Sequence, residues 1–259
     1  MRVTVVVIGA AGELGRLVTA GLTERGVDVR ALSRRSQDRC VVADLSEPST
    51  LAAAFAGGRA LFLVSSPIRE QVPLETNAID AAERAGIEHI VKVSNIPITG
   101  LETGLHANHR AIERRLAASS CRATVLQPSF FTSVIDKQRE LIARGRLVLP
   151  IGSGAIAWID PRDIAAVAIE AFMRSDLDRP LQVTGPEALS GGEVAARLGV
   201  QWVNPPLAQW REAAERSGLD PWLAASTVHL YEAVARGALA DVTDTVERVT
   251  GSQPRRAFA

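Results

Sequence analysis

Three glycines near the start of the chain have the spacing of a phosphate-binding loop. Gly9, Gly12 and Gly15 form G-x-x-G-x-x-G directly after the apolar run Thr4–Ile8, at the start of a segment with helical periodicity. The first glycine permits a sharp turn, the second lets the backbone approach a pyrophosphate, and the third allows close helix packing, while the helix N-terminus attracts the anion. Because this strand and helix supply the required context, we expect dinucleotide contacts from Gly9, Gly12, Glu13, Leu14 and Gly15.

Two arginines follow the second strand-like run, where a dinucleotide-binding fold recognises the adenosine ribose. Ser33, Arg34 and Arg35 directly follow the run Val27–Leu32. An NAD site needs a carboxylate here for the ribose 2′-hydroxyl, whereas guanidinium groups suit a 2′-phosphate through charge and paired hydrogen bonds. We therefore expect NADP(H), bound by these three residues. A solvated basic turn is the alternative, with Asp38 as an acid that would suit NAD.

Polar residues also follow the next two strand-like runs. Asp44 and Leu45 come after the third run, and Ser65, Ser66 and Pro67 come after the fourth. Ligands of open α/β sheets bind at the carboxyl ends of the strands. We expect the first two residues to contact the adenine, and the other three to lie near the ribose and nicotinamide.

The elements that must position these residues alternate regularly over the first half of the chain. Apolar, β-branched runs alternate with amphipathic segments, which predicts βαβ units and a parallel sheet covered on both faces. The predicted strands are Thr4–Ile8, Val27–Leu32, Cys40–Val42, Ala60–Val64, His89–Val93 and Ala123–Leu126. The predicted helices are Leu14–Arg25, Ser49–Ala56, Arg69–Ala85, His106–Ala118 and Pro161–Met173, the last capped by Asp160. Ser190 caps a further short helix, and the chain is predicted to be helical from Pro205 onward.

The predicted fold class is α/β, a Rossmann-type doubly wound parallel sheet with a smaller C-terminal α/β lobe. We assign residues 1–130 to the nucleotide-binding core and 131–259 to a substrate-binding lobe, integrated with it through possible chain crossovers.

Segments spread over nearly the whole chain resemble one known family. They read GAAGELG, VRALSRR, VVADLSEPSTLAAAFAG, ALFLVSSP, AIDAAERAGIEHIVKVSN, HRAIERRL, TVLQPSFF, TGPEALSGGEVA and VTDTVERVTGSQPRRAF. This set resembles the NmrA-like atypical short-chain dehydrogenase/reductases. The resemblance implies a Rossmann fold with a small C-terminal lobe, NADP(H) binding and reduction of quinones, aromatic ketones or dyes. Some members of the family bind the nucleotide only as a redox sensor.

The Tyr-x-x-x-Lys pair that most short-chain reductases use is missing. Aligning the glutamate of the extended members with Glu113 puts His109 at the lysine position and Leu105 at the tyrosine position. The single tyrosine, Tyr231, lies far along the chain, and neither of the two lysines falls on this helix. A histidine four residues before the glutamate is typical of the NmrA-like branch, so the resemblance does not carry over the tyrosine mechanism.

His109 and Ser94 are the candidate catalytic residues, and both are also expected to contact the cofactor. A histidine can donate a proton near neutral pH, although His109 alternatively binds a ribose hydroxyl or is a satisfied, partly buried residue. Ser94 stands where the family has a catalytic Ser or Thr and can hydrogen-bond a carbonyl, or it is an ordinary strand-end hydroxyl. Expected substrate contacts are Asn95, Phe130, Phe131 and Trp158. His106, His109 and Glu113 share a helix face, but the set lacks a further ligand and we expect no metal.

We therefore expect an NADPH-dependent reductase of a quinone or of an aromatic or polycyclic ketone. The alternatives are a non-catalytic NADP(H)-responsive regulator and an isomerase or dehydratase that does not consume its cofactor. A formal net charge of zero argues against nucleic-acid and anionic-membrane partners. We expect a cytoplasmic monomer or homodimer, since no targeting segment is recognised and the two cysteines suggest a reducing compartment.

Overall fold

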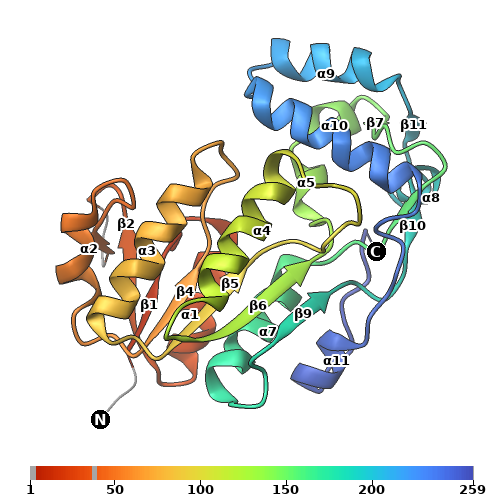
Figure 1. The fold of residues 1–259 in the computed structure, drawn as a ribbon. Helices are drawn as coiled ribbons and strands as arrows, with labels where there is room; N and C mark the ends of the chain where they lie inside the picture. Colours follow the sequence, from red (N-terminus) through yellow and green to blue (C-terminus); the bar gives the residue numbers. More distant parts are fainter. Residues whose placement is uncertain (1–3, 37–39, 259) are drawn as a thin grey trace. The chain divides into compact units, whose positions relative to one another are not determined.

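The computed structural model describes residues 4–36 and 40–258, and their contacts divide the chain into two compact units. The first unit comprises residues 1–94, 108–127 and 164–181, and the second comprises 95–107, 128–163 and 182–259. Figure 1 gives the order of the elements. In the described part of the chain, no helix combines the length and apolarity needed to cross a membrane.

The first unit is built on a seven-stranded sheet with the order β3-β2-β1-β4-β5-β6-β9. β1 pairs in parallel with β2 and β4, β2 with β3, and β5 with β4 and β6. The strands are β1 (Thr4–Val7), β2 (Asp28–Ser33), β3 (Cys40–Val42), β4 (Ala60–Leu63), β5 (His89–Val93), β6 (Arg122–Pro128) and β9 (Pro180–Val183). The predicted doubly wound parallel sheet is confirmed, and β9 is a strand that the sequence pattern did not indicate.

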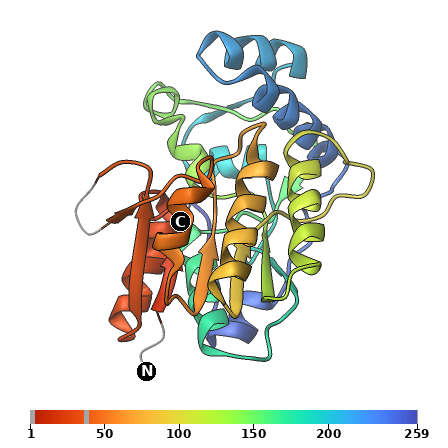
Figure 2. The same cartoon turned by 60° about the vertical axis from the view of Figure 1, so that its left-hand side comes forward.

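Helices cover both faces of this sheet (Figures 1 and 2). α2 (Pro48–Phe55), α3 (Gln71–Ala85) and α4 (Gly104–Ala117) lie on one face. α1 (Glu13–Glu24) and α7 (Pro161–Met173) lie on the other, where Arg25 and Glu170 form an ion pair of 2.6 Å. The predicted cap of α7 is confirmed, because the Asp160 carboxylate accepts from the Arg162 backbone N–H at 2.8 Å.

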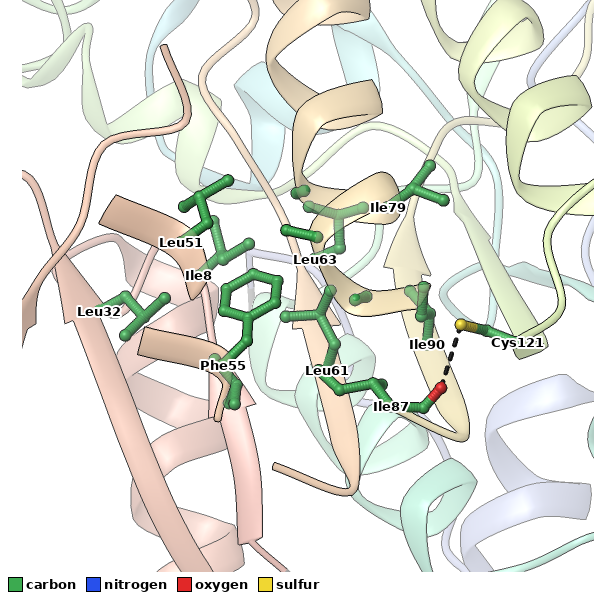
Figure 3. Close-up of a cluster of buried hydrophobic side chains, with 14 of the residues drawn as sticks. Ile8, Leu32, Leu51, Phe55, Leu61, Leu63, Ile79, Ile87, Ile90 and Cys121 are labelled. Atoms are coloured by element: carbon green, nitrogen blue, oxygen red, sulfur yellow. Dashed lines mark hydrogen bonds between the residues drawn. The ribbon is translucent and has the colours of Figure 1, made fainter. Parts of the chain in front are cut away.

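The core between α2, α3, α4 and the sheet is apolar (Figure 3). Phe55, Leu61 and Ile90 have no exposed surface, and truncating such a phenylalanine to alanine typically costs about 3–5 kcal/mol. Cys121 lies at the edge of this cluster, where its thiol donates to the Ile87 carbonyl at 3.1 Å and burial raises the pKa of the thiol.

The second unit combines two small sheets with helices of four to fifteen residues. β8 (Ala155–Ile156) pairs antiparallel with β10 (Leu189–Ser190), and β7 (Arg146–Val148) pairs in parallel with β11 (Gln201–Val203). Its remaining helices are α5 (Ser133–Asp136), α6 (Arg139–Ala143), α8 (Gly191–Arg197), α9 (Leu207–Arg216), α10 (Pro221–Ala235) and α11 (Thr245–Thr250). The predicted cap at Ser190 is confirmed as a capping box with Glu193.

Aromatic rings pack against one another within the largely aliphatic core of the second unit. The Trp158 ring lies 5.4 Å from both the Phe130 and Phe258 rings, each in an edge-on arrangement. Phe258 follows Arg255, which binds the buried Asp163 through its backbone N–H at 2.7 Å and through its guanidinium. The C-terminal segment is therefore part of this core.

The two units are interleaved along the chain. Residues 95–107 belong to the second unit and 164–181 to the first, so the chain crosses between the units more than once; the division into a nucleotide-binding core and a substrate-binding lobe stays a prediction. The physical reason is that α7 and the start of β9 complete the large sheet unit after the chain has already passed through the second unit.

Candidate functional site

The glycine loop has no room for side chains. Gly9 has a φ of 72°, and a Cβ atom there would lie 2.7 Å from the Val64 carbonyl oxygen. A Cβ atom at Gly15 would overlap the Gly9 carbonyl oxygen, and one at Gly12 would lie 3.2 Å from the same atom. The Gly12 N–H donates to that carbonyl at 2.8 Å, which closes the turn. The three glycines therefore place no side chain of their own over the loop backbone where α1 begins.

The start of α1 is open to an anion. Gly12 is the N-cap residue, and as a glycine it has no side chain to cap the helix. Gly12 and Glu13 are exposed, whereas Leu14 and Gly15 are buried against the sheet. Backbone N–H groups at a helix start, together with the helix dipole, bind phosphate groups. The loop thus fits the pyrophosphate of a dinucleotide.

The ends of β2 and β3 bring a basic residue and an acidic residue close together. Arg34 and Arg35 are exposed, and the Ser33 hydroxyl accepts from the Arg35 backbone N–H at 3.2 Å. Hydrogen bonds from Ser46, helped by the nearby Arg34 charge, lower the pKa of the Asp44 carboxyl. The basic turn is solvated and available to a phosphate, while Asp38 lies outside the described residues.

The end of β4 carries the first of two similar polar networks. The Ser65 hydroxyl donates to Glu75 Oε1 at 2.7 Å, and the Gln71 side-chain amide donates to the same oxygen at 3.2 Å. The Lys92 ammonium lies 3.0 Å from Glu75 Oε2, and both side chains of this ion pair have no exposed surface. Ser65 itself is partly exposed, and the predicted Ser66 and Pro67 are exposed beside it.

The loop that follows β3 is anchored to α3. The Leu45 carbonyl accepts from the Asn77 side-chain amide at 2.8 Å, and Leu45 is partly buried against the main core. The predicted adenine contact at Leu45 therefore belongs to a fixed part of the unit, and the contact itself stays a prediction.

The end of β5 carries the second network. The Ser94 hydroxyl donates to Glu113 Oε1 at 2.6 Å and accepts from the Arg110 guanidinium at 3.0 Å. Arg110 also pairs with Glu113 at 2.7 Å, and the Gln127 amide donates to Glu113 at 3.1 Å. A carboxylate can only accept, so the proton of the Ser94 hydroxyl points to Glu113. In this arrangement the Ser94 hydroxyl donates to Glu113 and accepts from Arg110, which differs from the expected donation to a carbonyl.

His109 lies on the sheet-facing side of α4. It is 7% exposed and shares this side with Ile112 and Leu116, which are almost fully buried. The cofactor and catalytic roles of His109 stay predictions, as does the catalytic role of Ser94.

The predicted substrate residues all lie in the second unit. Trp158 has no exposed surface, and the Phe130 ring packs against it, which favours core roles for both. Asn95 and Phe131 are partly exposed. Contact of these four residues with a substrate stays a prediction.

The single tyrosine lies in the core of the second unit. The Tyr231 ring packs edge-on against Trp210 at 5.1 Å. Its side chain is 4% exposed, and burial raises the pKa of its hydroxyl above the ordinary value. Its position in the aromatic core makes Tyr231 unsuited to replace the missing proton donor.

Sequence reasoning missed the side chains that hold the two serines. Glu75 and Lys92 are opposite charges at inward positions of a predicted helix and strand, which is a signal for a buried pair. Arg110 stands three residues before Glu113, a spacing that brings side chains together on a helix.

The chain is similar to a family of NAD(P)H-binding proteins and to several reductases. A family described as NAD(P)H-binding matches residues 9–175. An NAD(P)H azoreductase from Xenophilus azovorans is 33% identical over 275 residues, covering 98% of this chain and 95% of that protein. An NADPH-dependent quinone oxidoreductase from Escherichia coli, solved with NADPH, superposes with a TM-score of 0.88 at 24% identity, covering 98% of this chain and 97% of the other. The Citrobacter sp. triphenylmethane reductase with NADP(H) has a TM-score of 0.80 at 20% identity, covering 99% and 98%.

Proposed function

Since the chain belongs to the NAD(P)H-binding family of oxidoreductases, we propose that it reduces a quinone, an azo compound or an aromatic ketone with NADPH. The observation that carries this proposal is the bare glycine loop before α1, which fits a pyrophosphate. The similarity of nearly the whole chain to an azoreductase supports the acceptor class.

Each part of the nucleotide has candidate partners in the first unit. The loop of Gly9, Gly12 and Gly15 holds the pyrophosphate, and Arg34 and Arg35 bind the 2′-phosphate. When bound, NADPH supplies the hydride, while the protein orients it and excludes competing reactions.

The absence of the usual tyrosine proton donor bears on which hydride acceptors the protein can reduce. With no tyrosine at the position of Leu105, and with the Ser94 proton directed to Glu113, His109 is the one remaining candidate proton donor for a ketone oxygen among the predicted catalytic residues. Quinones and azo compounds accept hydride and can take the following proton from water. We therefore rank these two classes above aromatic ketones.

The test is NADPH oxidation, followed at the nicotinamide absorbance, with benzoquinones, naphthoquinones, azo dyes and aromatic ketones as acceptors. We expect enzyme-like rates with a quinone or an azo dye, and slower rates with ketones. Binding of NADPH without oxidation by any acceptor would contradict the proposal.

A non-catalytic NADP(H)-responsive regulator is the second candidate. The arrangement of Ser94, whose hydroxyl is occupied by Glu113 and Arg110, favours it because no donor is presented there. Such a protein would bind NADPH and NADP⁺ with different affinities and show no turnover. Steady turnover with any acceptor in the panel would exclude this candidate.

A further inference from the structure

The two polar networks at the strand ends have the same composition. In each, a serine after a strand donates its proton to a glutamate on the following helix, and a cation and a glutamine amide complete the glutamate's contacts. Ser65 is held by Glu75 of α3, and Ser94 is held by Glu113 of α4. The same direction of the hydroxyl proton thus occurs at two neighbouring strand ends.

The Lys92–Glu75 pair is not explained by stability alone. Neither side chain has exposed surface. Removing the two charges from water costs several kcal/mol per ion, and their mutual attraction is of about the same size, so the net stabilisation is small. Apolar residues of similar volume often serve equally well at such positions. We therefore expect the Lys92–Glu75 pair to have a role other than holding α3 on the sheet.

Its contacts show what the pair fixes. Lys92 also donates to the Val93 carbonyl, directly before Ser94, and Glu75 accepts the Ser65 proton. One buried pair thus connects the end of β4, the end of β5 and the first turns of α3. With its proton committed to Glu75, the partly exposed Ser65 hydroxyl presents acceptor lone pairs.

We propose that Lys92 and Glu75 are positioning residues for the nicotinamide half of the cofactor. Through Glu75 they hold the Ser65 hydroxyl as an acceptor for a ribose hydroxyl or for the carboxamide N–H. This inference rests on the proposed function, because it requires NADPH to bind across the carboxyl ends of β4 and β5. Ser65 is the residue that touches the nucleotide, and the ion pair acts through it.

The test compares the Kd of NADPH with the Kd of 2′,5′-ADP, which lacks the nicotinamide half, by calorimetry. The first variant is Glu75→Leu with Lys92→Met, which removes the acceptor without leaving a buried charge. We expect about tenfold weaker NADPH binding, the size of one lost hydrogen bond, and unchanged binding of 2′,5′-ADP. Equal weakening of both ligands would show a general structural defect and overturn the proposal.

A conservative variant separates hydroxyl direction from packing. Glu75→Gln with Lys92→Met keeps an oxygen that accepts the Ser65 proton, and we expect NADPH affinity within about twofold of wild type. An affinity as low as that of the Leu variant would overturn the proposal.

Ser65→Ala keeps the proposal testable if the apolar double variant does not fold. We expect it to weaken NADPH binding about tenfold while sparing 2′,5′-ADP, and to add nothing when combined with the apolar variant. Unchanged NADPH affinity, or full additivity, would overturn the role of the pair.

Asp80→Leu with Arg115→Met is the matched control, because this pair joins the same helix α3 to α4 away from the strand ends. We expect neither ligand to respond; a selective loss of NADPH affinity in this control would also overturn the proposal. Wild-type protein that fails to bind NADPH would refute the proposed function. If the wild-type protein binds and oxidises NADPH but the Glu75→Leu, Lys92→Met variant binds NADPH as tightly as wild type, this inference alone is refuted.

Discussion

Gly9 and Gly26 offer a matched pair of substitutions that isolates the crowding of the phosphate loop. Both residues have left-handed backbone conformations, with φ of 72° and 74°. A Cβ atom at Gly26 would meet nothing within 4 Å, whereas one at Gly9 would lie 2.7 Å from the Val64 carbonyl oxygen and 2.9 Å from its Cγ1 atom. Alanine at either position carries the same conformational penalty, and only Gly9→Ala adds a collision with the end of β4.

The two penalties have different sizes. A left-handed alanine costs about 1–2 kcal/mol, and overpacking a tight site costs about 1–3 kcal/mol more. We expect Gly26→Ala to lose about 1 kcal/mol of unfolding free energy and Gly9→Ala about 3 kcal/mol. Since 1 kcal/mol corresponds to roughly 2–4 °C in a domain of this size, the Tm values should fall by about 3 °C and about 9 °C.

Thermal unfolding without nucleotide, and NADPH titration of the folded variants, are the two measurements. Gly9→Ala should bind NADPH at least about tenfold more weakly, because relief of the collision shifts the loop backbone that holds the pyrophosphate. Gly26→Ala should bind like wild type. Equal losses of Tm together with equal affinities would refute the reasoning, since the Val64 contact would then have no effect.

Four further outcomes are expected. Arg34→Asp should reverse a preference for NADPH over NADH, with a change of about tenfold or more in the ratio of affinities; equal affinities in wild type would contradict the arginine argument. Tyr231→Phe should leave kcat and its pH profile unchanged, because the buried hydroxyl takes no part in the chemistry. For His109→Ala we expect kcat to fall. If the NADPH affinity is unchanged, the result favours proton donation, whereas a parallel loss of NADPH affinity favours binding of the ribose. Unchanged kcat and unchanged affinity would exclude both roles. Burial, with the nearby Arg122 charge, lowers the pKa of His89 to about 4, so stability should be fully present above pH ~6.5 and fall as pH drops towards 4. Urea unfolding at pH 7 and pH 4.5 should show this loss in wild type and a smaller one in His89→Gln.

The sequence predicted the elements whose signals are local. The glycine spacing behind Thr4–Ile8, the cap at Asp160 and the cap at Ser190 are short-range patterns, and the structure confirms all three. The strand β9 was missed because four residues beginning with proline are too few to establish an alternating pattern. Its place at the sheet edge depends on pairing with a distant segment.

The residues that surround the candidate site were harder to predict for a related reason. Lys92 stands in an apolar run and Glu75 in a helix seventeen residues earlier, and only the fold shows that they meet. The direction of the Ser94 proton likewise depends on Glu113 and Arg110, which lie on another element. The sequence therefore identified Ser94 as a residue of the candidate site, but it did not show that the Ser94 hydroxyl donates its proton to Glu113 and accepts from Arg110.

The interleaving of the two units has a consequence for how the chain is made. A ribosome delivers residues 128–163 of the second unit before α7 and β9 of the first. Until β9 emerges, β6 has an unpaired edge, and such edges pair readily with other chains. A fragment ending at residue 130 would keep the glycine loop yet expose that edge permanently, so cutting the chain between core and lobe should yield an aggregating product.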